Sequence, residues 1–266
     1  MSKIKNKFLQ LKKKKERALI AYIMAGFPNE KTTMSAGKGL VKGGADIIEI
    51  GYPFSDPIAD GPVIQNASTV SLNYGTKLDK FFQIIKKIRK ETDIPLVLMT
   101  YTNILYKKGF DKFMQKAKSV GIDGFVLPDM AIEESKAYLA AARKNHLDTI
   151  FLISPNTTTE RIKKILKDTS GFLYLVSIFG TTGMQTKIQK YTVDAIKKTK
   201  KIVNKRIPIG IGFGVNTPND ARKYLSLGID AIIVGSAFLR LIERTPASKI
   251  ESKIATFTKS LKNTTR

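Results

Sequence analysis

Short runs rich in Ile, Val and Leu recur along the whole chain, and each is followed by a stretch with helical periodicity. Continuous apolar runs of this kind are typical of strands buried on both faces, as in a parallel sheet covered by helices. Gly44, Gly121 and Gly228 stand just before three of the runs, where glycine can adopt the left-handed conformation that ends a helix. The sequence therefore predicts alternating strands and helices. The predicted strands begin near Leu19, Asp46, Ile94, Asp123, Thr149, Phe172, Ile207 and Asp230.

The spacing of these runs favours one closed (β/α)8 barrel, or TIM barrel, as a single domain over residues 1–266. Most runs are roughly 25 residues apart, the size of one βα unit, but the second and third are about twice as far apart. We therefore expect an extra loop and helix after the second strand, and a basic helix before the first. An open doubly wound sheet remains the alternative, because a count of strands does not establish closure.

The formal net charge of +24 raises the question of a nucleic-acid partner. The lysine runs at 12–15, 86–90, 163–167 and 198–205 are scattered along the chain and interleaved with Ile and Leu at helical spacing. Basic residues in this arrangement usually form the solvent-facing sides of amphipathic helices. We therefore expect no specific nucleic-acid function.

The apolar segments also bear on where the protein works. No segment reaches the roughly 18 apolar residues that a membrane-spanning helix needs. The basic run Lys12–Lys15 before Ala18–Phe27 imitates a secretory signal, but a leading helix followed by the first core strand is the preferred interpretation. The chain has no cysteine, which excludes disulfides and thiolate metal sites within it. We expect a cytoplasmic protein without a membrane contact.

The second predicted strand contains a carboxylate. Glu49 stands inside the apolar run DIIEIG, and a carboxylate is costly to bury unless it is paired or kept for chemistry. A strand-end glutamate that faces solvent or pairs with a lysine is the alternative. In the loop that follows, residues 51–62, prolines constrain the backbone more than an ordinary surface turn requires. This composition predicts an active-site loop. Its prolines and carboxylates are Pro53, Asp56, Pro57, Asp60 and Pro62.

Glycines follow the last three predicted strands. In a barrel the active site lies at the carboxyl ends of the strands, and the loops after strands seven and eight often bind phosphate. Glycine lets backbone N–H groups approach an anion, and a following helix adds its partial positive charge. These motifs predict a phosphorylated substrate; they are Gly180-Thr-Thr-Gly183, Gly212-Phe-Gly214 and Gly235-Ser236.

His146 is the only histidine, and it falls between a predicted helix and the following strand, at the end of the barrel opposite the active site. We therefore expect it on the surface. With no histidine at the strand ends and no cluster of carboxylates at ligand spacing, we predict no metal site.

These motifs resemble those of the tryptophan synthase alpha subunit family. The segment IEIGYPFSDPIADGPVIQNAS, from Ile48 to Ser68, is similar to that family's signature, and the resemblance extends along nearly the whole chain. Two departures are visible: threonine stands in the 180–183 motif where the family often has valine, and Ile178 stands where many members have arginine. Further matching segments are Tyr22 with 25–28, 99–103, 127–129 with 133–134, 154–156, Tyr174, 180–183, 212–214 and 235–237.

The resemblance implies a role for particular residues. The acid–base catalyst falls on Glu49, and the carboxylate that orients the indole falls on Asp60. The implied phosphate contacts are the backbone at Gly183, Gly212, Phe213, Gly214, Gly235 and Ser236. The implied indole pocket is Tyr22, Tyr101 and Tyr174, and the loop at Pro53, Asp56 and Pro57 is expected to contact a partner. That partner is a beta subunit that carries pyridoxal phosphate, in an α2β2 complex, while this chain itself needs no cofactor or metal.

The activity implied by the resemblance is a lyase reaction of tryptophan biosynthesis. Indole-3-glycerol phosphate would be cleaved to indole and glyceraldehyde 3-phosphate by a retro-aldol reaction, a chemistry that suits two carboxyl groups in different environments. Another phosphate-binding barrel enzyme, such as a sugar-phosphate isomerase or a glycerol-phosphate prenyltransferase, would share the glycine motifs but not the loop from Glu49 to Asp60. A catalytically silent subunit that only activates its partner stays open as well.

Overall fold

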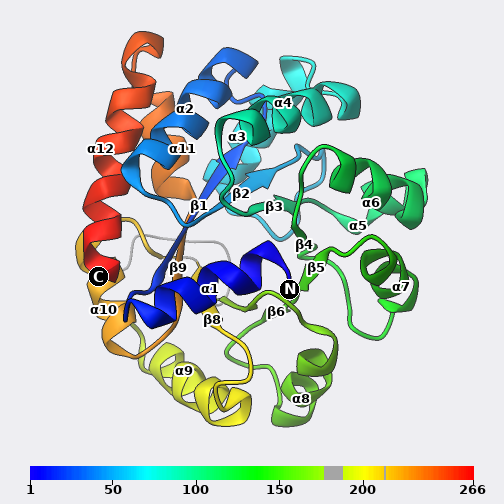
Figure 1. Cartoon of the computed structure of the whole chain (residues 1–266), viewed down its shortest axis with the longest axis vertical. Helices are drawn as coiled ribbons and strands as arrows, with labels where there is room; N and C mark the ends of the chain where they lie inside the picture. The colour runs from blue at the N-terminus through cyan, green and yellow to red at the C-terminus, as the bar shows by residue number, and fades with distance from the viewer. Residues whose placement is uncertain (177–187, 213) are drawn as a thin grey trace.

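A computed structural model describes residues 1–176, 188–212 and 214–266 of the chain. Within these residues the strands form one parallel sheet, in which β1 lies between β2 and β9. Figure 1 shows the strands at the centre of the molecule and the helices around them. The strands are β1 (Ala18–Met24), β2 (Ile47–Gly51), β3 (Leu96–Met99), β4 (Gly124–Val126), β5 (Asp148–Ile150), β6 (Leu152–Ile153), β7 (Leu173–Val176), β8 (Ile209–Gly212) and β9 (Ala231–Val234).

The sheet closes into a barrel through β5 and β6. The order of pairing begins with β5 and ends with β6, and only Phe151 separates these two segments in the chain. They are the two halves of one barrel strand, because β5 pairs with β4 while β6 pairs with β7. The break is bridged by the Tyr174 N–H, which donates to the Phe151 carbonyl oxygen at 3.0 Å. The closed (β/α)8 barrel is therefore confirmed, and the open sheet is not formed.

Each strand starts within two residues of its predicted position, and proline explains the two larger offsets. The predicted third and seventh strands begin at Ile94 and Ile207, but β3 and β8 begin at Leu96 and Ile209. In both cases a proline intervenes, which has no N–H to donate to a neighbouring strand. The carbonyl oxygens of these prolines still accept hydrogen bonds, Pro95 from Ile48 and Pro208 from Leu173.

The helices cover the outside of the barrel, and the two predicted additions are present. α1 precedes β1, and α3 with its preceding loop stands between β2 and α4. Gly44, which ends α2, has the expected left-handed backbone with φ 89°. The helices are α1 (Lys3–Lys13), α2 (Glu30–Gly43), α3 (Pro62–Asn73), α4 (Leu78–Glu91), α5 (Thr102–Lys108), α6 (Phe110–Ser119), α7 (Lys136–Lys144), α8 (Thr159–Asp168), α9 (Lys190–Val203), α10 (Pro218–Ser226), α11 (Ser236–Glu243) and α12 (Ile250–Lys262), with short 3-10 turns at Ala247–Lys249 and Asn263–Thr265.

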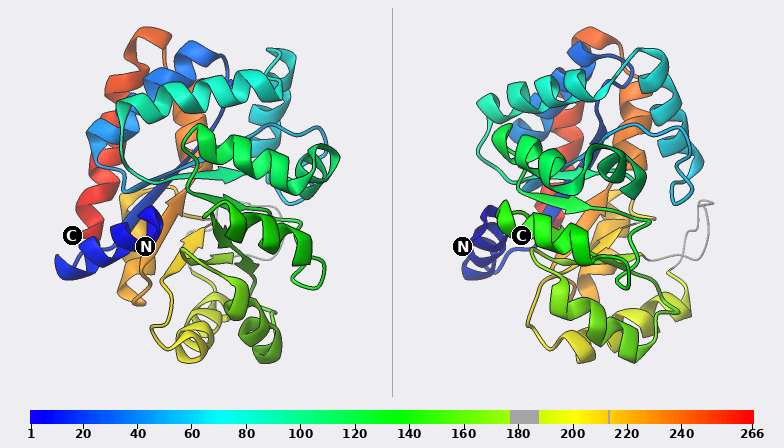
Figure 2. Two further views of the ribbon diagram at one scale, coloured as in Figure 1. Left: turned by 45° about the vertical axis from the view of Figure 1, so that its right-hand side comes forward. Right: turned by 90° about the vertical axis from the view of Figure 1, so that its right-hand side faces the viewer.

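The inside of the barrel is filled from its N-terminal end by α1. Ile4, Phe8 and Leu11 lie on one face of this helix and pack with the inward residues of the strands. The Phe8 ring lies 6.0 Å from the Phe172 ring, between ring centroids. Figures 1 and 2 show α1 lying across one end of the barrel. The first apolar segment, Ala18–Met24, is a fully buried core strand, as the preferred interpretation of the N-terminal region required.

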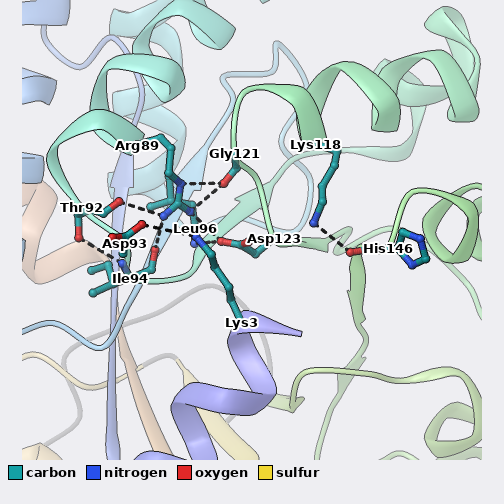
Figure 3. A network of polar contacts seen from close by, with 10 residues as sticks. All are labelled: Lys3, Arg89, Thr92, Asp93, Ile94, Leu96, Lys118, Gly121, Asp123 and His146. Atoms are coloured by element: carbon teal, nitrogen blue, oxygen red, sulfur yellow. Dashed lines mark hydrogen bonds and ion pairs between the residues drawn. The ribbon is translucent and has the colours of Figure 1, made fainter. Parts of the chain in front are cut away.

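A polar network ties the N-terminal ends of β3 and β4 together (Figure 3). The guanidinium group of Arg89 on α4 donates to the carbonyl oxygen of Gly121 and to Asp123 Oδ2, the latter at 2.7 Å. His146 lies at the same end of the barrel, exposed, and its carbonyl oxygen accepts from Lys118 Nζ at 3.3 Å. The placement of the single histidine on the surface agrees with the sequence prediction.

We predict that Phe8→Ala destabilises the fold by about 3 kcal/mol, because it opens a cavity where α1 closes the barrel. Leu9→Ala is the matched control, since the neighbouring Leu9 side chain is 40% exposed. Urea denaturation followed by circular dichroism measures both changes. Equal destabilisation by the two variants would show that α1 does not seal the barrel through this face.

Candidate active site

Glu49 lies on the inner face of the barrel. It is the third residue of β2, paired with Tyr22 of β1 on one side and Val97 of β3 on the other. Paired residues on neighbouring parallel strands point to the same side of the sheet, so the three side chains are neighbours. The Glu49 residue is only 1% exposed. The solvent-facing alternative is therefore wrong.

Burial without a partner determines the charge of Glu49. Neither of its carboxyl oxygens has a hydrogen-bond partner within the parts of the chain that the structure describes. Burial, and to a lesser degree the charge of Asp60, raises the pKa of Glu49 from 4.5 to about 8. At neutral pH the group is therefore mostly the neutral acid, able to donate a proton.

Asp60 is brought to the same pocket by the loop between β2 and α3. Its N–H donates to the Pro57 carbonyl oxygen at 3.0 Å, and its own carbonyl oxygen accepts from Gln65 Nε2 at 2.9 Å. The Asp60 residue is 3% exposed, and its Oδ2 accepts from the Tyr101 hydroxyl at 2.9 Å. Burial raises the pKa of Asp60 to about 6, and the hydrogen bond from Tyr101 opposes that rise. At neutral pH Asp60 is mostly ionised.

The three tyrosines of the expected indole pocket surround these carboxyl groups. Tyr22, Tyr101 and Tyr174 are all buried, and the pKa values of Tyr22 and Tyr174 are raised first by burial and then by the charges of Glu49 and Asp60. Two glycines make room for the rings: a Cβ atom at Gly51 would lie 2.2 Å from the Tyr22 hydroxyl oxygen, and one at Gly212 equally close to that of Tyr174. The structure thus brings both carboxyl groups and all three rings together.

An apolar part of the pocket was not identified from the sequence. Met99, Leu152 and Val176 belong to the strands' inner core but are only partly buried, and Met99 and Val176 are the last residues of their strands. They therefore lie near the carboxyl-terminal end of the barrel, where a flat aromatic ring can pack against them. Period-two alternation could have found them, since Val97 and Met99 share one face of β3, and Tyr174 and Val176 share one face of β7.

The glycines expected to bind phosphate lie at the carboxyl ends of β8 and β9. Gly212 is the last residue of β8, and Gly214 has a positive φ of 76°. Gly235 is the N-cap residue of α11, and Ser236 is the first residue of that helix. Backbone N–H groups and the positive end of α11 are therefore present at the carboxyl-terminal end of the barrel. Gly183 and Phe213, and the departures at Ile178 and within 180–183, lie outside the described residues.

The predicted partner loop presents some of its residues to solvent. Asp56 is exposed and Pro57 half-buried, while Pro53 is buried and shapes the loop from within. Ile58, which was not predicted as a partner contact, is 81% exposed between Pro57 and Ala59. An exposed apolar side chain such as Ile58, close to a charged one such as Asp56, is common in protein–protein interfaces.

Neither a metal cluster nor a membrane helix is found in the described part of the chain. No group of three or more His, Asp or Glu residues there could hold a metal ion. None of the helices described is long and apolar enough to cross a membrane.

The fold and the pocket define a (β/α)8-barrel protein of the enzyme type, with two buried carboxyl groups placed together at the end of the barrel where such enzymes have their active sites. Residues 8–266 match the model of the tryptophan synthase alpha chain family. The chain belongs to this family. It is 43% identical over 263 residues to the tryptophan synthase alpha chain of Trichormus variabilis, covering 98% of both chains.

Two further comparisons agree with this assignment. The alpha chain of Methanosarcina acetivorans is 42% identical over 261 residues, which cover 98% of this chain and 93% of that one. A chain in the crystal structure of the tryptophan synthase complex from Pyrococcus furiosus superposes with a TM-score of 0.85 at 34% identity, covering 92% of this chain and 98% of that one. The protein is therefore a lyase of tryptophan biosynthesis, and its reaction is the cleavage of indole-3-glycerol phosphate. The isomerase and prenyltransferase alternatives are set aside by this full-length match.

We predict that Glu49→Gln raises the free energy of unfolding, and that the gain grows with pH. The pKa of Glu49 is about 8 in the folded chain against 4.5 when exposed, so the wild type loses stability as pH rises through this window. The loss amounts to at most about 1.4 kcal/mol per pH unit, and glutamine does not titrate. Urea denaturation at pH 5 and pH 8 measures it. A constant difference between the two proteins would contradict the raised pKa.

Proposed function

We propose that Glu49 is the general acid and base of the cleavage and that Asp60 stabilises the charge that develops on the indole. The observation that carries this proposal is the pair of environments: Glu49 is buried with no partner among the described residues, while Asp60 holds a hydrogen bond from Tyr101. Their pKa values of about 8 and about 6 leave one group protonated and the other ionised near neutral pH. A donor of protons and a fixed negative charge are thus present in one pocket.

The reaction divides into two proton transfers. The Glu49 carboxyl gives its proton to C3 of the indole, which places positive charge on the ring nitrogen, and Asp60 accepts a hydrogen bond from that N–H. The Glu49 carboxylate then takes the proton of the hydroxyl on the carbon attached to C3. As that carbon becomes an aldehyde, the carbon–carbon bond breaks and its electron pair restores the neutral indole. Glu49 ends protonated, ready for the next cycle.

The remaining candidate residues position the substrate in this scheme. The backbone around Gly212, Gly214, Gly235 and Ser236 would hold the phosphate, with Gly183 and Phe213 completing the site. The rings of Tyr22, Tyr101 and Tyr174 would enclose the indole. Every step uses this chain's own side chains, and the alpha chain family has no cofactor of its own.

We further propose that the protein works in the cytoplasm with a beta subunit that carries pyridoxal phosphate, in an α2β2 assembly. Support comes from the tryptophan synthase complex that contains a similar chain, and from the exposed loop at Asp56, Pro57 and Ile58. We also propose that residues 1–266 act as one domain. The last helix supports this, because Lys262 at its end pairs with Asp46 before β2 and with Glu16 before β1.

We predict that Glu49→Gln abolishes the release of indole from indole-3-glycerol phosphate, because the amide keeps the shape but has no transferable proton. Asp60→Asn should lose less, since an amide oxygen can still accept from the indole N–H. Indole release by the purified chain, alone and with a beta subunit, is the measurement. Turnover by Glu49→Gln above about a tenth of wild type would contradict the acid–base role.

For the partner loop we predict that Asp56→Ala leaves the basal rate of the isolated chain nearly unchanged and lowers the stimulation by a beta subunit. Asp56 is exposed on the loop that carries the buried Asp60, so we expect its loss to change the partner contact and not the chemistry. Asp93→Ala is the control, a carboxylate at the opposite end of the barrel whose side chain is fully exposed. Equal stimulation of wild type and Asp56→Ala at matched occupancy would remove Asp56 from the coupling.

A further inference from the structure

The hydroxyl group of Tyr101 makes two hydrogen bonds to the loop after β2. It donates to Asp60 Oδ2 at 2.9 Å and accepts from the N–H of Ala59 at 3.1 Å. The Tyr101 ring also stacks on Phe54 of the same loop, with ring centroids 5.0 Å apart and planes 25° apart. One side chain therefore contacts the loop at two places, at Phe54 and at Ala59–Asp60.

This arrangement makes the two oxygens of Asp60 different. Oδ2 is occupied by Tyr101, while Oδ1 is buried and has no hydrogen-bond partner among the residues that the structure describes. A hydrogen bond to one oxygen of a carboxylate fixes the orientation of the whole group, and with it the position of the other oxygen. A buried oxygen without a hydrogen bond costs free energy unless a ligand donates to it. The indole N–H of the substrate is a donor of the required kind.

We propose that Tyr101 is a positioning residue: its hydroxyl orients Asp60 so that Oδ1 is presented to the indole N–H. This role goes beyond lining the pocket, and it rests on the proposed function of Asp60. The hydroxyl does not touch the reacting bond. It acts through the carboxylate that stabilises the developing charge.

The backbone next to Tyr101 is held by a residue that follows β4. Tyr101 is the N-cap residue of α5, and the next residue, Thr102, donates its N–H to the carboxylate of Asp129 at 3.0 and 3.1 Å. The Thr102 hydroxyl donates to Asp129 as well, at 2.9 Å. Asp129 follows β4, so the ends of β2, β3 and β4 are joined through Tyr101. These contacts hold the backbone next to Tyr101, from which its side chain reaches Asp60.

The same hydrogen bond influences the charge of Asp60. Burial raises the pKa of Asp60 and the Tyr101 hydroxyl lowers it, so removing the hydroxyl leaves burial unopposed and the pKa rises above about 6. Among the described residues, the other titratable groups of the pocket are Glu49 on β2, Tyr22 on β1, Tyr174 on β7 and Tyr101 itself. Burial raises the pKa of each of them, so near pH 6 these groups are neutral while Asp60 titrates.

The test is Tyr101→Phe in the full chain, which keeps the ring and its stacking on Phe54. We expect kcat for indole release at neutral pH to fall about tenfold to a hundredfold, the range for loss of a hydrogen bond to a charged group. The acidic limb of the kcat profile should move to higher pH, while KM should change less than about threefold. Tyr106→Phe is the matched control: it is the same change within α5, at a residue that is 74% exposed, and it should leave kcat, KM and the acidic limb unchanged.

Two measurements separate positioning from a merely structural role. In the Asp60→Asn background, Tyr101→Phe should add little further loss, because the group that it positions is already changed. A full additional loss there, or an acidic limb that does not move, would overturn the proposal. The titration of Asp60 by carboxyl-carbon NMR, in wild type and Tyr101→Phe, is a readout that does not depend on activity. An unchanged Asp60 titration contradicts the role of Tyr101, whereas undiminished turnover by Asp60→Asn alone contradicts the proposed function of Asp60 itself.

Discussion

The burial of the Glu49 carboxyl group inside a closed barrel is the constraint on which the site depends. Closure through β5 and β6 leaves no edge on which the strands' inner residues could reach water, and α1 fills the N-terminal end. Glu49 therefore lies in an apolar environment, paired directly with Tyr22 and Val97 on the neighbouring strands. Desolvation then favours its neutral form, which is the form that a general acid needs.

The second carboxyl group is held in the opposite state by a different route. Asp60 comes from a loop and not from a strand, so it can be approached by Tyr101, whose hydrogen bond favours the ionised form. The strands of the barrel surround Glu49 with apolar side chains, and the loop places Asp60 where the Tyr101 hydroxyl can donate to it. This division costs stability, since a buried carboxyl without a partner among the described residues opposes folding above its ordinary pKa.

Much of this could be predicted from the sequence, and the exceptions have physical reasons. Glu49 could be identified because a carboxylate is unusual inside an apolar run. The strands could be identified because they alternate regularly with helices. The break of one strand at Phe151 leaves no mark on the apolar run. The hydrogen bond from Tyr101 to Asp60 joins residues that are 41 positions apart, and no local sequence pattern predicts such a contact. Met99 and Val176 look like ordinary core residues until closure places them at the mouth of the pocket.

The ionisation of Glu49 itself tests most directly whether burial in the barrel sets the charge of this group. Infrared difference spectra of the wild type against Glu49→Gln, recorded from pH 5 to pH 9, isolate the carbonyl stretch of this one protonated carboxyl group. If burial raises the pKa of Glu49, the band persists at pH 7 and disappears with a midpoint of about 8. A Glu49 carboxylate that is already ionised at pH 6 would contradict the claim that burial in the barrel sets up its chemistry.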